Sequence, residues 1–336
     1  MTAIYDLPMP GSTDLERSNQ LTSLIKEEIS LNNGFISFAR YMDLALYHPE
    51  LGYYNSASFT LGSEGDFTTA PEISPIFAHS IARYFCTALH QLDQGSILEL
   101  GAGTGRFAGD ALTALKQLGC LPKHYLIYEP NIRLRQKQQH FLAAHYPDQH
   151  QLISWIDTLP INFKGVIFAN EVLDALPVHC FHVEKNSISE RGVTWVNDQF
   201  AWQCRPTTLI ELATEANSIQ TQFLLPSGYQ SEINLTIPNI IQTIADSLTE
   251  GTILFIDYGY GRSEYYHPER REGTLTCFYK HRRHADPFIF PGLQDITAHV
   301  DFTYLAEKST EYGLTLAGYT TQAGFLLDNG LADIIS

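Results

Sequence analysis

The sequence predicts an α/β protein with a doubly wound, mostly parallel sheet, an N-terminal helical segment and an inserted β-hairpin and long-loop region. Two observations lead to this fold class. From Gly95 onward, short apolar runs suited to burial on both faces alternate with stretches of helical period. A glycine-rich loop also joins the first of these runs to the first of these helices. This alternation is typical of a parallel sheet covered by helices, with ligands at the carboxyl ends of its strands.

The part of the chain before the sheet is predicted to be helical. Residues 1–14 contain two prolines and a glycine without any period, which is typical of a flexible tail. Residues 15–94 are expected to form a helical segment that packs on the core, because apolar residues recur at helical spacing over 15–31 and 75–92. Ser37 is expected to cap a short helix between these two.

The sheet and its helices are predicted over residues 95–177 and 237–336. Helices are expected near 105–118, 131–145 and 237–249. The five predicted strands are Ser96–Leu100, Tyr125–Tyr128, Leu152–Trp155, Val166–Ala169 and Ile253–Asp257.

Two stretches interrupt this pattern. Residues 178–236 are expected to be an inserted hairpin and helix region, with strands at Val178–Val183 and Val193–Gln203 and the turn near Glu190–Gly192. An open hairpin edge offers a surface for a second copy of the chain, so a homodimer is considered. Residues 261–300 show little period and are expected to be a long functional loop.

Composition restricts the partners. The 336 residues are 44% hydrophobic with a net charge of −16, which suits a packed core and argues against nucleic acid as a partner. No apolar run approaches the ~18 residues of a membrane span, and no presequence is recognised, so a cytoplasmic, bacterial-type location is expected. The five cysteines are at least 24 residues apart, which is typical of reduced thiols and not of a CxxC zinc site.

The strongest local signal is the glycine loop that follows the first strand. Gly101, Gly103 and Gly105 alternate with other residues, and Glu99 precedes the first glycine by two positions. A dinucleotide fingerprint needs a third glycine where this chain has Arg106. The loop instead resembles motif I of class I S-adenosylmethionine-dependent methyltransferases.

Acidic residues after the next two strands extend this signal. Glu129 ends the second strand, where an ionised carboxylate accepts the hydroxyl protons of a ribose. Asp157 follows the third strand and is a candidate to accept from an adenine amino group. A solvated acid for Glu129 and a turn or cap aspartate for Asp157 are the structural alternatives.

Polar residues at the end of the fourth strand are the candidates for chemistry. Methyl transfer from a sulfonium is an in-line displacement, so the protein supplies proximity and placement of charge. Glu171 and Asp174 would share one face if the segment is helical, and Asn170 can orient an acceptor. Capping or surface roles for these three residues are the alternative.

A stretch rich in histidine and arginine forms a second candidate group. His281 and His284 have no HExxH spacing, and Arg282 and Arg283 would repel a cation, so no metal site is expected. An acceptor-cradling loop and a hydrogen-bonded structural lid remain as interpretations. The carboxylates and imidazole that follow this stretch are Asp286, Asp295, His299 and Asp301.

At these residues the chain resembles the MidA-like family of bacterial and mitochondrial methyltransferases. The resemblance covers about residues 20–330, and the strings TAPE, NEVLDALP and DITAHVDF are its most specific parts. The matching blocks are Phe67–Phe77, Leu98–Gly105, Asn170–Pro177, Ile256–Gly259, Gly273–Leu275, Asp286-Pro287, Pro291-Gly292, Asp295–Phe302 and Thr321–Phe325.

The resemblance implies a class I methyltransferase fold with S-adenosyl-L-methionine as cofactor. It implies that the glycine loop and Glu129 bind that cofactor and that the NEVLDALP block lies beside donor and acceptor. It also implies that the segment from Thr69 to Glu72 closes over the cofactor. The mitochondrial relatives methylate protein arginine on a core subunit of respiratory complex I, which implies a protein partner with an exposed arginine.

Two alternatives stay open. Because a fold does not fix a function, the acceptor could be a small molecule, or the chain could be an assembly chaperone that binds the cofactor without turnover. The paired-glutamate hairpin of the main protein arginine methyltransferases is not seen, so its logic transfers to Glu171 and Asp174 only by chemical analogy.

Overall fold

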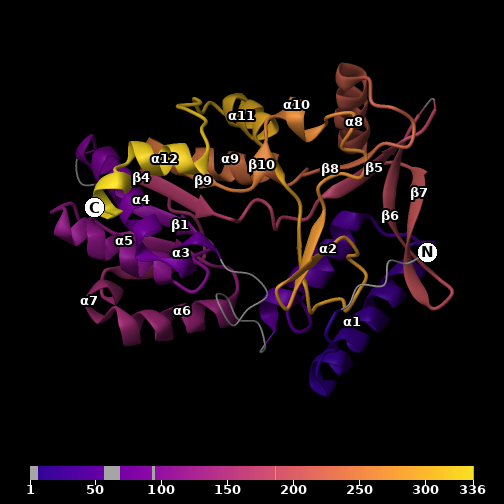
Figure 1. Ribbon diagram of the computed structural model, residues 1–336, viewed down its shortest axis with the longest axis horizontal. Coiled ribbons are helices and arrows are strands. Elements are labelled where there is room, and N and C mark those ends of the chain that lie inside the picture. The colour runs from indigo at the N-terminus through magenta and orange to yellow at the C-terminus, as the bar shows by residue number, and fades with distance from the viewer. Residues whose placement is uncertain (1–6, 57–68, 93–94, 186, 336) are drawn as a thin grey trace.

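A five-stranded parallel sheet forms the centre of one lobe in the computed structural model, which describes residues 7–56, 69–92, 95–185 and 187–335 (Figure 1). The strand order is β3-β2-β1-β4-β9, and every neighbouring pair is parallel. The predicted fold class is thereby confirmed. The strands are β1 (Ser96–Leu100), β2 (Tyr125–Tyr128), β3 (Ile153–Ile156), β4 (Phe163–Asn170) and β9 (Leu248–Ile256).

Helices cover both faces of this sheet because successive strand residues point to opposite sides. Ile97 of β1 packs with α4 and α5, whereas Leu98 packs with α9. Phe107 of α5 stacks on Phe168 of β4 with ring centroids 4.4 Å apart. The helices of this lobe are α3 (Ala70–Ile73), α4 (Pro75–His90), α5 (Arg106–Gln117), α6 (Ile132–His145), α7 (Pro147–His150) and α9 (Ile237–Ser247).

A four-stranded antiparallel sheet, ordered β7-β6-β5-β8, builds the second lobe. Helices α1 and α2 cover one of its faces and α8 covers the other (Figure 1). The elements are α1 (Ser12–Leu31), α2 (Phe38–Tyr47), β5 (His179–Val183), β6 (Ile188–Val196), β7 (Gln199–Pro206), α8 (Ile210–Phe223) and β8 (Gln230–Ile233).

The second lobe corrects two predictions and confirms a third. Helix α1 begins at Ser12, so the predicted tail of residues 1–14 is too long. Helices α1 and α2 pack on the inserted sheet and not on the core, because their apolar faces meet β5 and β6. The capping prediction is confirmed, since the Ser37 side chain accepts from the backbone N–H of Arg40.

The hairpin turn was predicted in the wrong place. Residues 190–192 lie inside β6, and the predicted strand Val193–Gln203 is wrong, because a tight turn at Asn197-Asp198 divides it between β6 and β7. Both turn residues have positive φ, 51° and 58°, as a type I′ hairpin turn requires. Asn and Asp tolerate this backbone region, whereas Arg191 pairs with Cys204 in the middle of the ladder.

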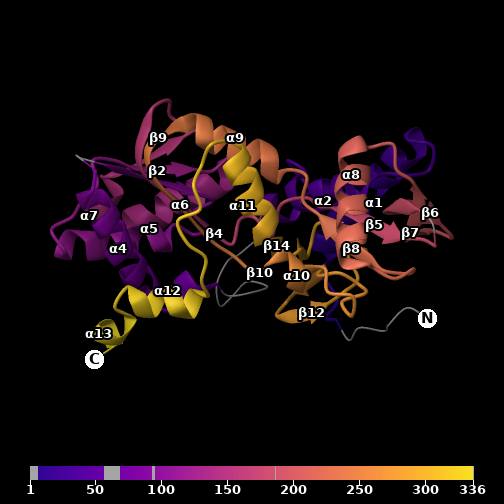
Figure 2. The same cartoon turned by 90° about the horizontal axis from the view of Figure 1, so that it is seen from above.

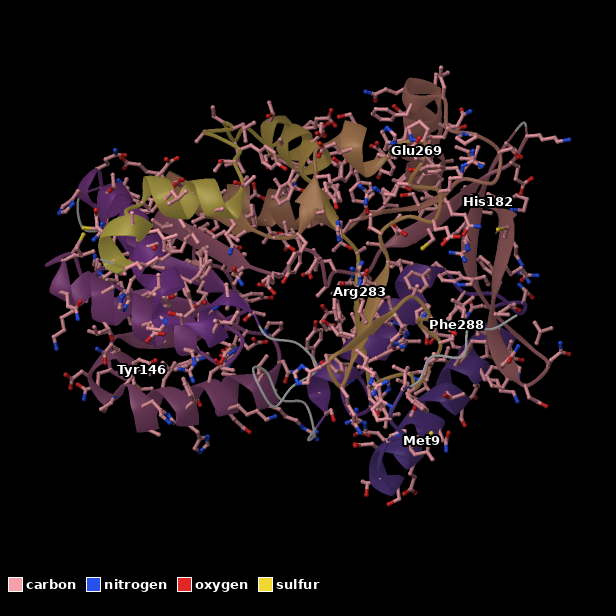
Figure 3. The ribbon with its side chains drawn as sticks, viewed as in Figure 1. Met9, Tyr146, His182, Glu269, Arg283 and Phe288 are labelled. Carbon is pink, nitrogen blue, oxygen red and sulfur yellow. The ribbon has the colours of Figure 1, made fainter. Side chains whose placement is uncertain are left out.

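Residues 261–300 are not the long irregular loop that the sequence predicted. They carry α10 (Arg262–Tyr265), β11 (Thr276–Tyr279), β12 (Arg282–His284) and β13 (Asp295–Thr297), and the three strands form a small antiparallel sheet. Strands of three or four residues are too short to show a period. Phe288, labelled in Figure 3, packs on Trp202 of β7 with ring centroids 5.0 Å apart, and this contact connects the region to the second lobe.

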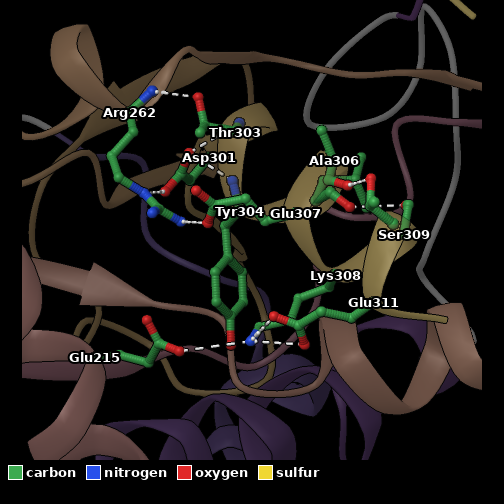
Figure 4. A network of polar contacts seen from close by, with 12 residues as sticks. Glu215, Arg262, Asp301, Thr303, Tyr304, Ala306, Glu307, Lys308, Ser309 and Glu311 are labelled. Carbon is green, nitrogen blue, oxygen red and sulfur yellow. Dashed lines mark hydrogen bonds and ion pairs between the residues drawn. The ribbon is translucent and has the colours of Figure 1, made fainter. Parts of the chain in front are cut away.

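An ion-pair network holds α11 (Phe302–Glu311) beside the strand pair β10 (Gly259–Tyr260) and β14 (Val300–Asp301) (Figure 4). Asp301 caps the helix by accepting from the N–H groups of Thr303 and Tyr304. Arg262 Nε lies 2.9 Å from Asp301 Oδ2, and both side chains are largely buried. Asp301 therefore has a structural role, as the cap of α11 and the partner of Arg262.

Replacing Asp301 by Ala is expected to destabilise the protein by about 3 kcal/mol, because one change removes a helix cap and leaves the buried Arg262 without this partner. Asp301→Asn keeps the cap through Oδ1 and loses only the oxygen that accepts from Arg262 Nε, so it should cost less. Urea unfolding of the two variants checks the difference. Equal losses would show that capping contributes nothing.

The C-terminal helices return to the first lobe. Figure 2 shows α12 (Gln322–Asp328) and α13 (Leu331–Ile335) beside α4, where Arg83 pairs with Asp333. Phe67 and Thr68 of the family-like block fall outside the described residues. Within the described ranges, none of the helices has both the length and the apolar character that a bilayer crossing needs.

Candidate functional site

One cavity of about 1180 Å³ lies at the carboxyl ends of the parallel strands, where the two lobes meet. Its walls come from β1, β2 and β4 of the first lobe, from α9, and from the segments around Tyr47 and Thr297 on the side of the second lobe. Ligands of doubly wound sheets bind at this edge. The predicted residues at the cavity are Glu99, Gly101, Gly103, Glu129, Asn170, Glu171, Asp174, Thr69 and Glu72.

The glycine loop turns tightly between β1 and α5. Gly101 has φ of +65°, and a Cβ there would lie 3.0 Å from Val172 Cγ2, so any other residue at this position would be strained. Gly105 takes φ of +86° as the N-cap of α5, but it does not line the cavity. The loop thereby brings the backbone at 101–104 against the cavity.

Glu99 lies at the cavity but is almost completely buried in β1. Its Oε2 accepts from the Tyr125 hydroxyl at 2.8 Å. Burial raises the pKa of Glu99 to about 8, an effect that outweighs this hydrogen bond. The carboxyl is therefore largely protonated at neutral pH and can donate a hydrogen bond into the cavity.

Glu129 follows β2 and is held in one orientation. Its two oxygens accept from the backbone N–H of Asn131 and from Gln138 Nε2, each at 3.0 Å. Each carboxylate oxygen has a further lone pair, so both can still accept from a ligand with two neighbouring hydroxyls. Burial raises the pKa of Glu129. Gln138 was missed by sequence reasoning, because it lies within a mainly polar helix.

Asp157 does not join this group. It pairs with Arg135 at 2.8 Å, its side chain is 85% exposed, and it is not among the cavity residues. The prediction that Asp157 follows the third strand is correct. Its ion pair with Arg135 of α6 joins two different elements, and the order of the strands along the chain does not reveal such a contact. A role in holding adenine is therefore not supported by its position.

Glu72 of α3 connects the N-terminal segment to the glycine loop. It accepts from the Thr104 hydroxyl at 2.5 Å and pairs with Arg106 Nε at 3.2 Å. Thr69, at the N-cap of α3, also lines the cavity. The carboxylate of Glu72 therefore binds residues of the glycine loop and of the start of α5, and these contacts hold the loop backbone against the cavity.

The end of β4 forms a sharp turn instead of the helix considered from the sequence. Glu171 has φ of +51°, and Asp257, at the end of β9, accepts from the N–H groups of Leu173 and Asp174 at 2.8 and 3.3 Å. These bonds fix the turn so that Glu171 and Asp174 still face the same cavity. Asp257 was missed as a site residue although it follows a strand just as Glu129 does.

The two carboxyl groups at this turn interact with each other; Asp174 is buried and Glu171 is half-buried. Burial raises the pKa of Glu171, although Tyr258, Asn170 and the Ala70 N–H all donate to it. Burial, then the charge of Asp257, raise the pKa of Asp174 well above its usual range. A cation in the cavity would relieve this repulsion, so the turn favours cationic ligands.

Aromatic side chains form the opposite wall. Tyr47 and Tyr54 stack with ring centroids 5.4 Å apart. The Tyr54 hydroxyl donates to Asp295 Oδ1 at 2.8 Å, and the Tyr47 hydroxyl donates to the Ala175 carbonyl at 2.8 Å. Of the candidate residues in and after the histidine- and arginine-rich stretch, Asp295 lines the cavity, and the nearby Thr297 does so too. His284 and His299 do not line it.

Two buried polar atoms at the cavity, Asn170 Oδ1 and Asp174 Oδ1, have no hydrogen-bond partner among the residues that the structure describes. Buried polar atoms without a partner are costly, so a ligand that donates hydrogen bonds here is expected. Together with the ribose-type acceptor pair of Glu129 and the open backbone at Gly101, these atoms fit a nucleoside cofactor and a hydrogen-bond-donating acceptor.

The ligand-free protein is expected to lose stability as the pH rises from about 4.5 to 8. The native state keeps a proton on Glu99 that the unfolded chain has released, so the loss reaches about 5 kcal/mol at most. Urea unfolding at several pH values checks this for the protein and for Glu99→Gln, which has no proton to lose. Parallel pH profiles would contradict the assignment to Glu99.

The comparisons with known proteins agree with this geometry. A family model described as "Putative S-adenosyl-L-methionine-dependent methyltransferase" matches residues 80–320. A Burkholderia thailandensis structure, titled as a "likely methyl transferase" bound to S-adenosyl-homocysteine, is 39% identical with a TM-score of 0.94. The alignment covers 98% of this chain and 86% of that one.

Curated relatives carry a more specific name. "Protein arginine methyltransferase NDUFAF7, mitochondrial" of Danio rerio is 30% identical over 89% of this chain and 74% of its own length. The Caenorhabditis elegans homologue is 27% identical over 97% of this chain and 80% of its own length. Because these relatives are named as mitochondrial, they contradict the expected cytoplasmic location.

Proposed function

Since the chain belongs to this S-adenosyl-L-methionine-dependent methyltransferase family, we propose that it methylates the guanidino group of an arginine in a protein. The observation that carries the proposal is the pair of carboxyl groups of Glu171 and Asp174 at the turn after β4, which faces a cavity large enough for the cofactor and an inserted side chain. The names of the curated relatives support the same acceptor.

The cofactor side of the cavity is proposed to be the wall of β1 and β2. The backbone at Gly101 and Gly103 and the carboxyl groups of Glu99 and Glu129 would hold the nucleoside and amino-acid parts. When bound, the cofactor supplies a methyl group on a sulfonium, which an in-line nucleophile displaces. The side chain of Glu72 keeps the glycine loop in place through Thr104.

The acceptor side is proposed to be the turn after β4. Glu171 and Asp174 would hold the guanidinium, since carboxylates bind its planar fork through paired hydrogen bonds. Asn170 would accept one further N–H through its partnerless Oδ1. As the N–C bond forms and the C–S bond breaks, the electron pair stays on sulfur and the nitrogen gives up one proton, for which these carboxylates are acceptors.

The aromatic wall is proposed to guide the acceptor into the cavity. Tyr47 and Tyr54 present stacked rings, and a guanidinium packs well on such faces. On the family resemblance, we further propose that the acceptor protein belongs to respiratory complex I assembly. A homodimer through the β7 edge remains a prediction.

The test is transfer of labelled methyl from S-adenosyl-L-methionine into a lysate of a strain that lacks the protein. Label in methylarginine within one protein band supports the proposal. Label only in a low-molecular-mass fraction would assign a small-molecule acceptor instead. Cofactor binding without any transfer, together with full rescue of the strain by Glu171→Gln, would indicate an assembly chaperone.

A further inference from the structure

Two thiols and an imidazole meet at the edge of the sheet opposite the cavity. Cys86 and His90 are one turn apart on the last turns of α4, so they share a face of the helix. Cys120 follows α5 in the chain and lies against them. The sequence separates Cys86 from Cys120 by 34 positions, which is why spacing alone did not connect them.

The end of α5 explains how Cys120 arrives there. Gly119 has φ of +68°, its N–H donates to the Lys116 carbonyl, and the Cys120 N–H donates to the Leu115 carbonyl. This pair of bonds is a Schellman motif, which reverses the chain after a helix. The reversal buries Cys120 against α4, because its side chain belongs to the apolar cluster between the two helices.

The donor atoms of this cluster lie close enough for one metal ion to bind them all after a small rotation of the imidazole. Cys86 Sγ lies 3.7 Å from His90 Nδ1, and Cys120 Sγ lies 3.9 Å from His90 Nε2. One donor atom from each residue falls within 4.8 Å of the others. Tetrahedral zinc, with Zn–S of about 2.3 Å and Zn–N of about 2.0 Å, sets its donors roughly 3.5–3.8 Å apart. The imidazole is exposed, so it can turn one nitrogen toward both sulfurs.

The structure assigns a zinc site to Cys86, His90 and Cys120. Two thiolates and an imidazole are a donor set that zinc prefers, and the exposed side of the cluster leaves the fourth position to water. None of the three lines the cavity, so the metal would not take part in methyl transfer. It would instead cross-link α4 to the chain after α5, the two elements that cover one face of the sheet.

The site is tested on the purified full-length protein, reduced and stripped of metal, by titration with ZnCl₂ and separately with CoCl₂. One equivalent is expected to bind, with cobalt showing thiolate charge-transfer absorption and the visible bands of tetrahedral coordination. Binding is expected to weaken at least about 100-fold in Cys86→Ser and in His90→Gln. Cys204→Ser removes an exposed thiol elsewhere and should bind like the unchanged protein.

His90→Gln keeps the test informative if a cysteine variant unfolds, since the imidazole is exposed and its loss creates no cavity. Zinc should also raise the midpoint of thermal unfolding of the unchanged protein and leave that of His90→Gln unmoved. The assignment is overturned if the reduced protein takes up no stoichiometric metal, or if His90→Gln and Cys86→Ser bind as tightly as the unchanged protein. A disulfide between Cys86 and Cys120 that persists in excess zinc and reductant would overturn it too.

Discussion

Replacing Glu171 by Gln is expected to lower the rate of methyl transfer by about 10²–10³-fold while the affinity for the cofactor stays unchanged. The substitution keeps the size of the side chain and one accepting oxygen but removes the charge that holds a cationic acceptor. A loss of this size is typical when one charge-placing or proton-accepting group is removed from an active site. Single-turnover transfer and cofactor titration, measured on the same preparation, separate the two effects.

Asp174→Asn provides a second measure of the same turn. Asp174 is the more deeply buried carboxyl and repels Asp257, so its neutral variant should be at least as stable as the unchanged protein while transferring methyl far more slowly. Glu250→Gln, at an exposed ion pair with Lys164, is the matched control and should change neither property. Full activity in both Glu171→Gln and Asp174→Asn would remove the turn from the proposed chemistry.

The second large effect is expected at Glu129. Its replacement by Ala should weaken cofactor binding by about 100-fold, because two charge-assisted hydrogen bonds to ribose hydroxyls, together about 3 kcal/mol, are lost. The reaction rate at saturating cofactor should fall much less. Isothermal titration with S-adenosyl-homocysteine measures the affinity directly.

Asp157→Asn is the control for this prediction, since the exposed Asp157 pairs with Arg135 away from the cavity. It should bind the cofactor like the unchanged protein. A large loss at Asp157 together with a small loss at Glu129 would reverse the proposed assignment of the two carboxylates.

The parallel sheet could be predicted because burial on both faces leaves a direct mark in the sequence. β1 and β2 have the predicted bounds, since each is an apolar run between polar turns. The small strands β12 and β13 left no such mark, because the charged residues Arg282, Arg283 and Asp295 leave no apolar run there. The hairpin turn was predicted near Gly192 because glycine is common in turns. The residues that have positive φ are instead Asn197 and Asp198.

The candidate site could be predicted where a residue acts through its position at a strand end. Glu129, Asn170 and Glu171 follow this rule and reach the cavity. Tyr54 and Asp295 could not be paired in advance, since their hydrogen bond joins residues 241 positions apart. Asp157 also follows a strand, but it forms an ion pair with Arg135 and does not line the cavity. Long-range contacts therefore decide which of the plausible strand-end residues face the ligand.

The hydrogen bonds from the turn after β4 to Asp257 also bear on how the protein folds. They connect positions 83 to 85 residues apart, with the whole inserted sheet between them. Contacts of such high sequence separation form slowly, because a long loop must close before they contribute any energy. The turn that carries Glu171 and Asp174 is therefore expected to be assembled after β1, β2 and β4 have paired. During synthesis it cannot form before β9 has left the ribosome, so the acceptor side of the cavity matures last.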